Sequence, residues 1–483
     1  MSNILQKFAQ HGYQVHPEAL RILQNSDPDD IDPLIQQVLT NLDESILVVG
    51  PEHILSARSP LANGKGDIDI CAPRYSVMGG IAGPVGDVEQ ICIKVLRDVP
   101  PRCAGKYEEF AEYFRNRYVK LSGIIKKRIS PRAISGLQRP SDGKTTTSII
   151  GMVSNVSTTS KGDSLITLED ETGEAKVLLK GRHNIMLDEV VGVTGFQKNG
   201  LFIAKDITYP EIALSRKPKG GSGAAIFISD LHFGSREFLD DAWRKFVSWL
   251  NLEIGDDSKK TLAEKVKYIL VAGDLVDGVG IYPEQEKELS ISDIYKQYEK
   301  AAEELQKVPH RIKIIISPGN HDAVRLAEPQ PKLPSEITSL FSNNTTFVGN
   351  PAYVEIENLK VLIYHGCSIW DFVKTFNISY KEPQKAMAEM LRRRHLAPVY
   401  GGEVPIAPER EDYLVIDEVP DIFHSGHVHT VGIDNYRGVT LINSGTWQSQ
   451  TEYQQRRGIV PVPGEAPLVD LSTMDICRLR FEK

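Results

Sequence analysis

The chain has 483 residues, of which 41% are hydrophobic and 25% charged, as in an ordinary globular protein. No apolar run reaches the length of about 18 residues that crosses a membrane, so we expect no transmembrane helix. The net charge of −8 argues against a freestanding nucleic-acid binder, which is usually basic. Contact with nucleic acid would therefore be local, metal-assisted or shared with a partner.

The five cysteines are scattered and form no Cys-x-x-Cys pair, which argues against a disulfide scaffold and a zinc ribbon. The first residues lack the charged and apolar regions of a secretory signal. We therefore expect a protein of a reducing compartment, the cytoplasm.

Residues 1–54 are expected to form a helical interaction module. After Asp32-Pro33, the apolar residues from Leu34 to Leu42 fall on one face of a helix. Residues 55–112 are rich in Gly, Pro and Ser and show almost no periodicity, which predicts a linker.

Residues 113–212 are expected to form a small OB-like β-barrel. Thr172-Gly173 and Asn199-Gly200 stand where hairpin turns are needed, and Asn-Gly is typical of such turns. Lys126–Arg128, at the end of the first expected strand, are candidates for lining a DNA groove, or else ordinary solvated charges. The expected strands are Tyr118–Ile125, Ile149–Val153, Ser164–Leu168, Ala175–Leu179, Val190–Gly195 and Leu201–Ala204.

Residues 224–483 alternate apolar strands with helical stretches, which predicts an α/β layered domain. Five of its strands end in metal-ligand side chains, and glycines beside them allow the backbone to turn sharply. Because strand ends meet at the rim of a sheet, these side chains can reach one crevice. The side chains in question are Asp230 and His232, Asp274, Asn320 with His321 and Asp322, His365, and His427 with His429.

Carboxylates, imidazoles and one carboxamide together form a mixed oxygen and nitrogen donor set. Such a set suits Mn²⁺, Fe²⁺, Zn²⁺ or Ni²⁺ better than Mg²⁺, which prefers oxygen. A lone motif of this kind would mean little, but five of them in sequence at strand ends indicate a metal site. His424 lies outside the set, and we expect it to be structural.

The order of these motifs resembles that of the calcineurin-like metallophosphoesterases, over Ala224 to about Thr446. The resemblance implies an α/β metallophosphoesterase sandwich of mixed sheets with flanking helices, and two metal ions bridged by Asp274. It also implies that His321 stabilises charge or protonates the leaving oxygen, and we expect Asp322 to orient it. The implied ligands are Asp230, His232, Asp274 and His429 for one ion, and Asp274, Asn320, His365 and His427 for the other.

Further motifs resemble the small subunit of the archaeal family D DNA polymerases. They are the Arg-rich segment Ala386–Gly401, Pro405–Glu409 and Asn443–Gln448, together with the barrel upstream. This resemblance implies a proofreading 3′–5′ exonuclease that works with Mn²⁺, binds a large catalytic subunit and acts on single-stranded or mismatched DNA 3′ ends. A sliding clamp is left open as a further partner, although the sequence has no convincing clamp-binding box. No membrane contact is expected.

The Arg-rich segment supplies four candidates for DNA phosphate contact: Arg392, Arg393, Arg394 and His395. The alternative is a solvated helix face with salt bridges. Two other functions also stay open for the whole chain. One is a scaffold for the large subunit, and the other is a phosphatase or cyclic-nucleotide phosphodiesterase on the same metal site.

Overall fold

The computed structural model describes residues 93–100, 102–138, 145–214 and 220–482, together with a few positions before residue 93. The chain divides into two compact units, Met1–Ile81 and Ala82–Lys483. In the first unit, β1 (Gln14–Val15) pairs in parallel with β2 (Val48–Val49). This strand pair was not expected in a helical module. Leu23, Ile35 and Val38 are helical and buried, Pro33 and Gln36 are helical and exposed, and apart from the strand pair the other residues of the module lie outside the described residues.

Most of the expected linker, residues 55–92, also lies outside the described residues. Its last part was predicted wrongly, because residues 93–112 contain a strand and the start of a helix. Strand β3 (Ile93–Arg97) pairs antiparallel with β13 (Ala352–Ile356) at the edge of a sheet. Arg97 anchors this edge through a 2.7 Å hydrogen bond to the Asp417 carboxylate. The paired residues Ile93 and Ile356 lie more than half of the chain apart in sequence, so local composition gave no sign of the pairing.

Five strands close into a barrel in the order β4-β5-β6-β8-β7. Each of these five observed strands contains one of the five strands that the sequence predicts between Ile149 and Ala204. Asn199 and Gly200 both have positive φ, as a tight hairpin turn between β7 and β8 requires. The strands are β4 (Thr147–Thr158), β5 (Ser164–Asp170), β6 (Gly173–Leu179), β7 (Val190–Lys198) and β8 (Leu201–Thr208).

The predicted strand Tyr118–Ile125 is wrong, because these residues form the second half of the helix α5 (Tyr107–Ile125). The helix buries Arg117, Leu121 and Ile125, which are spaced by four residues, against the barrel and its neighbours. Gly192 on β7 permits this approach, since a Cβ there would lie 2.8 Å from the Ile125 side chain. Lys126–Arg128 therefore follow a helix and not a strand.

The remaining described residues form two six-stranded mixed sheets, in the orders β12-β11-β10-β9-β18-β19 and β16-β17-β15-β14-β13-β3. The strands of the first sheet are β9 (Ala224–Ile228), β10 (Val266–Ala272), β11 (Lys313–Ser317), β12 (Thr345–Phe347), β18 (Glu465–Asp470) and β19 (Ile476–Arg480). Those of the second are β3, β13, β14 (Leu359–Ile363), β15 (Ile422–Ser425), β16 (Val431–Tyr436) and β17 (Val439–Ser444).

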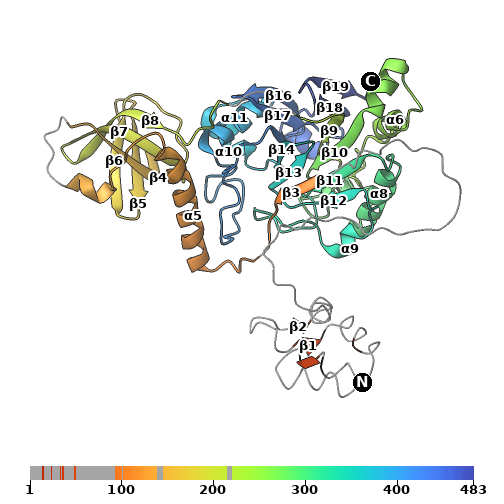
Figure 1. The fold of residues 1–483 in the computed structure, drawn as a ribbon, viewed down its shortest axis with the longest axis horizontal. Coiled ribbons are helices and arrows are strands. Elements are labelled where there is room, and N and C mark those ends of the chain that lie inside the picture. The colour runs from red at the N-terminus through yellow and green to blue at the C-terminus, as the bar shows by residue number, and fades with distance from the viewer. Residues whose placement is uncertain are drawn as a thin grey trace. The chain divides into compact units, whose positions relative to one another are not determined.

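The two sheets pack face to face, and helices cover their outer faces (Figure 1). The inner core joins residues such as Phe227 and Leu270 of the first sheet to Val361 and Ile442 of the second. The first sheet carries α6 (Asp240–Leu250) and α8 (Ile294–Gln306) outside, and the second carries α10 (Ile369–Phe376) and α11 (Pro383–Arg393). The other helices are α7 (Asp257–Glu264), α9 (Ser335–Thr338) and α12 (Glu452–Arg456).

The parallel strands set the position of the site. β9, β10 and β11 are mutually parallel neighbours, and so are β14, β15 and β17 in the second sheet. The carboxyl ends of parallel neighbours share one edge of a sheet, so the loops that follow them can meet. Among the described residues, no helix is long and apolar enough to cross a membrane.

Candidate metal centre

The loops after β9, β10, β11, β14 and β15 bring the seven predicted ligands together. On one side, His429 Nε2 lies 3.3 Å from Asp230 Oδ1 and 3.1 Å from His232 Nε2. On the other side, His365 Nε2 lies 3.0 Å from Asn320 Oδ1 and 3.2 Å from Asp274 Oδ2. The spacing within each group is that of donors around one cation.

Asp274 and His427 connect the two groups. Asp274 Oδ2, which lies beside His365, is also 3.9 Å from His232 Nε2. The backbone N–H of His427 donates to the Asp230 carboxylate at 2.9 Å, while its ring packs 5.1 Å from that of His365. A bridging role for Asp274 is thus compatible with the geometry.

Five of the candidate ligands have left-handed backbone conformations. The φ angles are 53° at Asp230, 52° at His232, 51° at Asp274, 68° at His427 and 56° at His429. A non-glycine residue in this region costs about 1–3 kcal/mol, and such strain concentrates at functional sites. The surrounding fold therefore holds these side chains in place at the expense of backbone energy.

Hydrogen bonds behind the ligands fix the histidine rings. His365 Nδ1 lies 2.8 Å from the Ala272 carbonyl oxygen, to which it can donate, so Nε2 is left free for a cation. His232 Nδ1 lies 3.0 Å from Asp277 Oδ1, and His429 Nδ1 lies 2.9 Å from Gln454 Nε2. Asp277 in turn accepts from Gln448 Nε2 at 2.9 Å.

Sequence reasoning missed Asp277 and Gln454 as members of the site. Asp277 stands only three residues after Asp274, and an acidic residue so close to a ligand is the one signal that could have suggested it. Gln454 follows the last recognised motif and carries no local sign of its role. Gln448 ended a quoted motif but had no role assigned.

The electrostatics of the site favour cation binding at Asp274, His232 and His427. Burial lowers the pKa of His365, but the charge of Asp274 outweighs burial and raises this pKa to about 10, so a cation must displace the proton of that ring. Burial raises the pKa of a carboxyl, yet the charges of His365 and His321 hold the pKa of Asp274 well below its ordinary value. Burial lowers the pKa of His232, and burial together with the charge of His365 lowers that of His427 to about 3. The carboxylate thus stays ionised and these two imidazoles stay neutral, the forms that bind a cation.

Comparison with known proteins finds relatives that match this chain over most or all of its length. Residues 225–430 match the family model that describes the B subunits of DNA polymerases alpha and epsilon. The DNA polymerase II small subunit of Archaeoglobus fulgidus is 49% identical over 416 residues, which cover 82% of this chain and 83% of that one. That of Methanothermobacter thermautotrophicus is 38% identical over 503 residues, which cover 99% of both chains.

The chain belongs to the family of archaeal DNA polymerase II small subunits, the small subunits of the family D polymerases. A solved structure described as a novel archaeal phosphodiesterase is also similar, at 15% identity. That match covers 53% of this chain and 98% of the other, with a TM-score of 0.26. Membership of the family rests on the relatives that match over most or all of the chain.

In this family member, His321 lies at the edge of the ligand cluster. Its ring packs 4.7 Å from that of His232, and its Nε2 lies 3.9 Å from Asp274 Oδ2. Its Nδ1 lies 2.7 Å from the backbone carbonyl oxygen of Asp277, which therefore sets the ring orientation. The expectation that Asp322 orients His321 is wrong.

Asp322 instead holds the loop after β11 against the loop after β10. It is buried, and its carboxylate accepts from the backbone N–H of Gly319 at 2.8 Å and of Leu275 at 3.2 Å. It also accepts from the Tyr298 hydroxyl at 3.0 Å. Burial raises the pKa of this carboxyl to about 6.

The Arg-rich segment is mostly internal. Arg393 is buried in ion pairs with Glu189 and Glu389, and Arg394 donates to the backbone carbonyls of residues 416 and 417. His395 Nε2 lies 2.9 Å from the buried Asp412 carboxylate. The expectation of DNA contact fails for these three residues, because protein partners already occupy their polar groups. Arg392, with 42% of its side chain exposed, remains a candidate.

The predicted structural role of His424 fits its surroundings. The side chain is buried against Phe227 at 5.0 Å, and its Nε2 lies 3.0 Å from the Ser444 hydroxyl. Burial lowers the pKa of His424 to about 3, so the ring is neutral.

A pocket of about 410 Å³ opens onto the ligand cluster. His232, Asn320, His321 and His427 form part of its lining, together with an aromatic group further out. In this group Tyr282 stacks on Tyr453 with ring centroids 4.8 Å apart, and the guanidinium of Arg457 lies 4.9 Å from the Tyr453 ring centre. Sequence reasoning did not identify these three residues.

Proposed function

We propose that this chain is the exonuclease subunit of an archaeal replicative DNA polymerase and removes nucleotides from DNA 3′ ends. The observation that carries the proposal is the complete set of carboxylate, imidazole and carboxamide donors at one end of a pocket. A scaffolding subunit has no need of such a set, nor of the backbone strain that holds it. Membership of the polymerase small-subunit family supports DNA as the substrate and a large polymerase subunit as the partner.

The ligands divide into two sets that share Asp274. Asp230, His232 and His429 form one set with it, and Asn320, His365 and His427 form the other. Two divalent cations, for which we propose Mn²⁺, would supply Lewis acidity to the scissile phosphodiester and acidify the attacking water. The protein contributes rigidly held ligands and a pocket that admits the end of a strand.

His321 is suited to donate a proton to the leaving 3′ oxygen. Burial lowers its pKa, but the charges of Asp274 and Asp277 outweigh burial and raise the pKa above the ordinary value of a histidine. With Nδ1 bonded to the Asp277 carbonyl, the imidazole presents Nε2 beside the ligand cluster. We therefore propose His321 as the general acid.

Arg457 is suited to hold the phosphate backbone of the strand. It lines the pocket and lies over the Tyr453 ring, and no ion pair of the described residues includes it. A free guanidinium beside a stacked pair of tyrosines matches the combination of charge and aromatic surface that single strands bind. The variant Arg457→Ala should raise the KM for a single-stranded substrate more than it lowers kcat, and an unchanged KM would remove this residue from the proposal.

The proposed function also assigns a role to each domain of the chain. We propose that residues 113–212 include an OB-fold domain, supported by the five-stranded closed barrel, and that residues 224–483 form the phosphoesterase domain. We further propose residues 1–54 as the interaction module and residues 55–92 as its linker.

The test is nucleotide release by the purified full-length chain in Mn²⁺. The substrate is a primer labelled at its 5′ end and mismatched at its 3′ end, annealed to a template. We expect shortening from the 3′ end that His365→Ala and Asp274→Asn abolish, while the exposed His310→Ala variant retains it. If the unaltered chain takes up no metal and cuts no phosphodiester, the scaffolding role is correct. Faster turnover of a phosphoprotein than of DNA would instead favour a phosphatase.

A further inference from the structure

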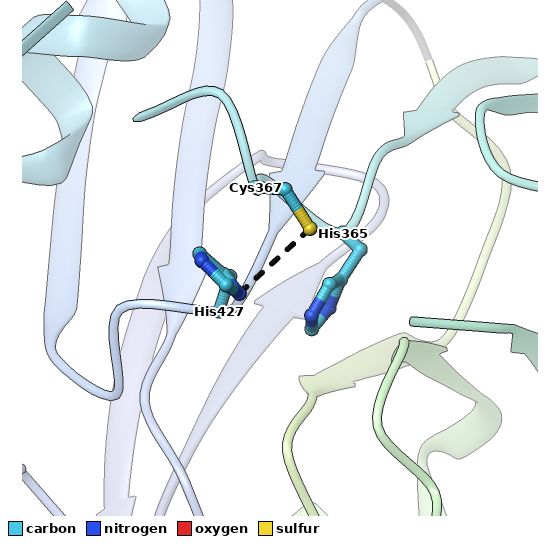
Figure 2. A group of neighbouring side chains, drawn as sticks. All are labelled: His365, Cys367 and His427. Carbon is cyan, nitrogen blue, oxygen red and sulfur yellow. Dashed lines mark hydrogen bonds between the residues drawn. The ribbon is translucent and has the colours of Figure 1, made fainter. Parts of the chain in front are cut away.

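A sulfur atom lies beside the ligand set formed by Asn320, His365 and His427, and the proposed mechanism does not use it. Cys367 stands two residues after His365, between the end of β14 and the start of α10. Figure 2 shows its Sγ pointing toward the space between the rings of His365 and His427. One donor atom from each of these three residues lies within 4.8 Å of the others.

The distances fit shared coordination. Cys367 Sγ lies 3.9 Å from His427 Nδ1 and 3.3 Å from Asn320 Oδ1. A sulfur about 2.3 Å and a nitrogen about 2.0–2.1 Å from one zinc ion lie about 3.5 Å apart at the tetrahedral angle. The observed separation from His427 exceeds this value by only a few tenths of an ångström.

The other thiols in the described residues have different surroundings. Cys477 is exposed on β19, and Cys103 packs against Arg325 with Sγ 3.4 Å from a guanidinium nitrogen. Of these thiols, Cys367 is the one that a metal-ligand cluster includes. The cluster, and not the thiol alone, therefore distinguishes this position.

We propose that Cys367 is a sulfur ligand in the half of the site formed by Asn320, His365 and His427. This half would then take a thiophilic divalent cation of the Zn²⁺ and Co²⁺ type in preference to Mn²⁺. Thiolates select soft and borderline cations, whereas Mn²⁺ prefers oxygen donors. On binding, the thiol gives its proton to solvent and the sulfur donates an electron pair to the cation. The proposal rests on the metal site of the proposed function and changes one part of it. A thiophilic cation replaces Mn²⁺ in this half, while the half formed by Asp230, His232 and His429 keeps Mn²⁺.

The test uses Co²⁺ as a spectroscopic probe of the full-length chain after removal of metals with a chelator. We expect a near-ultraviolet thiolate-to-cobalt charge-transfer band in the unaltered chain and in the control Cys477→Ser. The band should be absent in Cys367→Ser and Cys367→Ala. Thermal unfolding of each variant shows whether the fold is kept.

Competition between metals provides the second readout. Loss of a residue that only forms a hydrogen bond to a metal ligand already lowers metal affinity by about 10–100-fold. We therefore expect Cys367→Ser to weaken Zn²⁺ binding by at least this factor while Mn²⁺ affinity changes little. Co²⁺ binding without the band, or a band that persists in folded Cys367→Ser, overturns this proposal and leaves the proposed function standing. If the unaltered chain binds no Co²⁺, Zn²⁺ or Mn²⁺, both fail.

Discussion

Replacing Asp277 by Asn tests whether the groups behind the ligands control metal affinity. Asp277 is buried, lies 3.0 Å from His232 Nδ1, and accepts hydrogen bonds from Gln448 Nε2 at 2.9 Å and Gln285 Nε2 at 3.1 Å. Burial raises its pKa, but the bond to His232 outweighs burial and lowers it, so the side chain is a carboxylate. A carboxylate has two acceptor oxygens for the donors of His232, Gln448 and Gln285, whereas an Asn side chain has one. The amide nitrogen of Asn is itself a donor and would have to face one of these three donors.

The expected loss is about 10–100-fold in metal affinity, or about 1.4–2.7 kcal/mol. Calorimetric titration of Mn²⁺ into the metal-free chain measures it directly. The Mn²⁺ concentration needed for half-maximal nucleotide release should rise by the same factor. The exposed Asp257→Asn on α7 serves as control and should bind as the unaltered chain does. Unchanged affinity in a folded Asp277→Asn variant would refute the role assigned to this side chain.

Three further changes probe other features. Gly319→Ala should abolish metal binding measured by calorimetry, because its Cβ would lie 2.2 Å from Asp274 Oδ1; retained binding would contradict the ligand geometry. Arg117→Met removes the cation that Asp412 pairs with at 2.7 Å and leaves this buried carboxylate its hydrogen bonds from Tyr113 and His395. The free energy of unfolding in urea should therefore fall by about 3 kcal/mol, and an unchanged value would contradict this role. His424 has a pKa of about 3 when folded and about 6.5 when unfolded, so only the unfolded chain binds its proton between these values. Its contribution to stability is therefore complete above pH 6.5 and falls by up to about 1.4 kcal/mol per pH unit below it. The loss of stability from pH 7 to 5 should be smaller in a folded His424→Asn variant than in the unaltered metal-free chain, and an equal loss would contradict this.

The sequence alone determined the elements that depend on local pattern. The short apolar runs separated by turn residues, with Asn199-Gly200 as the strongest turn, predicted the barrel strands, because turn geometry is set within a few residues. The gathering of the candidate ligands in one place was predictable for a related reason. The apolar strands and the polar residue after each one are local features, and parallel strands must bring their carboxyl ends to one edge.

The tertiary structure decided what depends on distant partners. Residues 118–125 alternate like a strand, but they are helical because residues spaced by four pack onto the barrel and its neighbours. Arg393 was predicted to lie at the surface, whether it bound DNA or solvent. It is buried because it pairs with Glu189, which lies 204 residues away along the chain. Likewise His321 takes its orientation from the carbonyl of Asp277, and Cys367 gains its significance from His427, 60 residues further on. A side chain's partners are set by which surfaces the fold brings together, and the sequence near that side chain does not contain them.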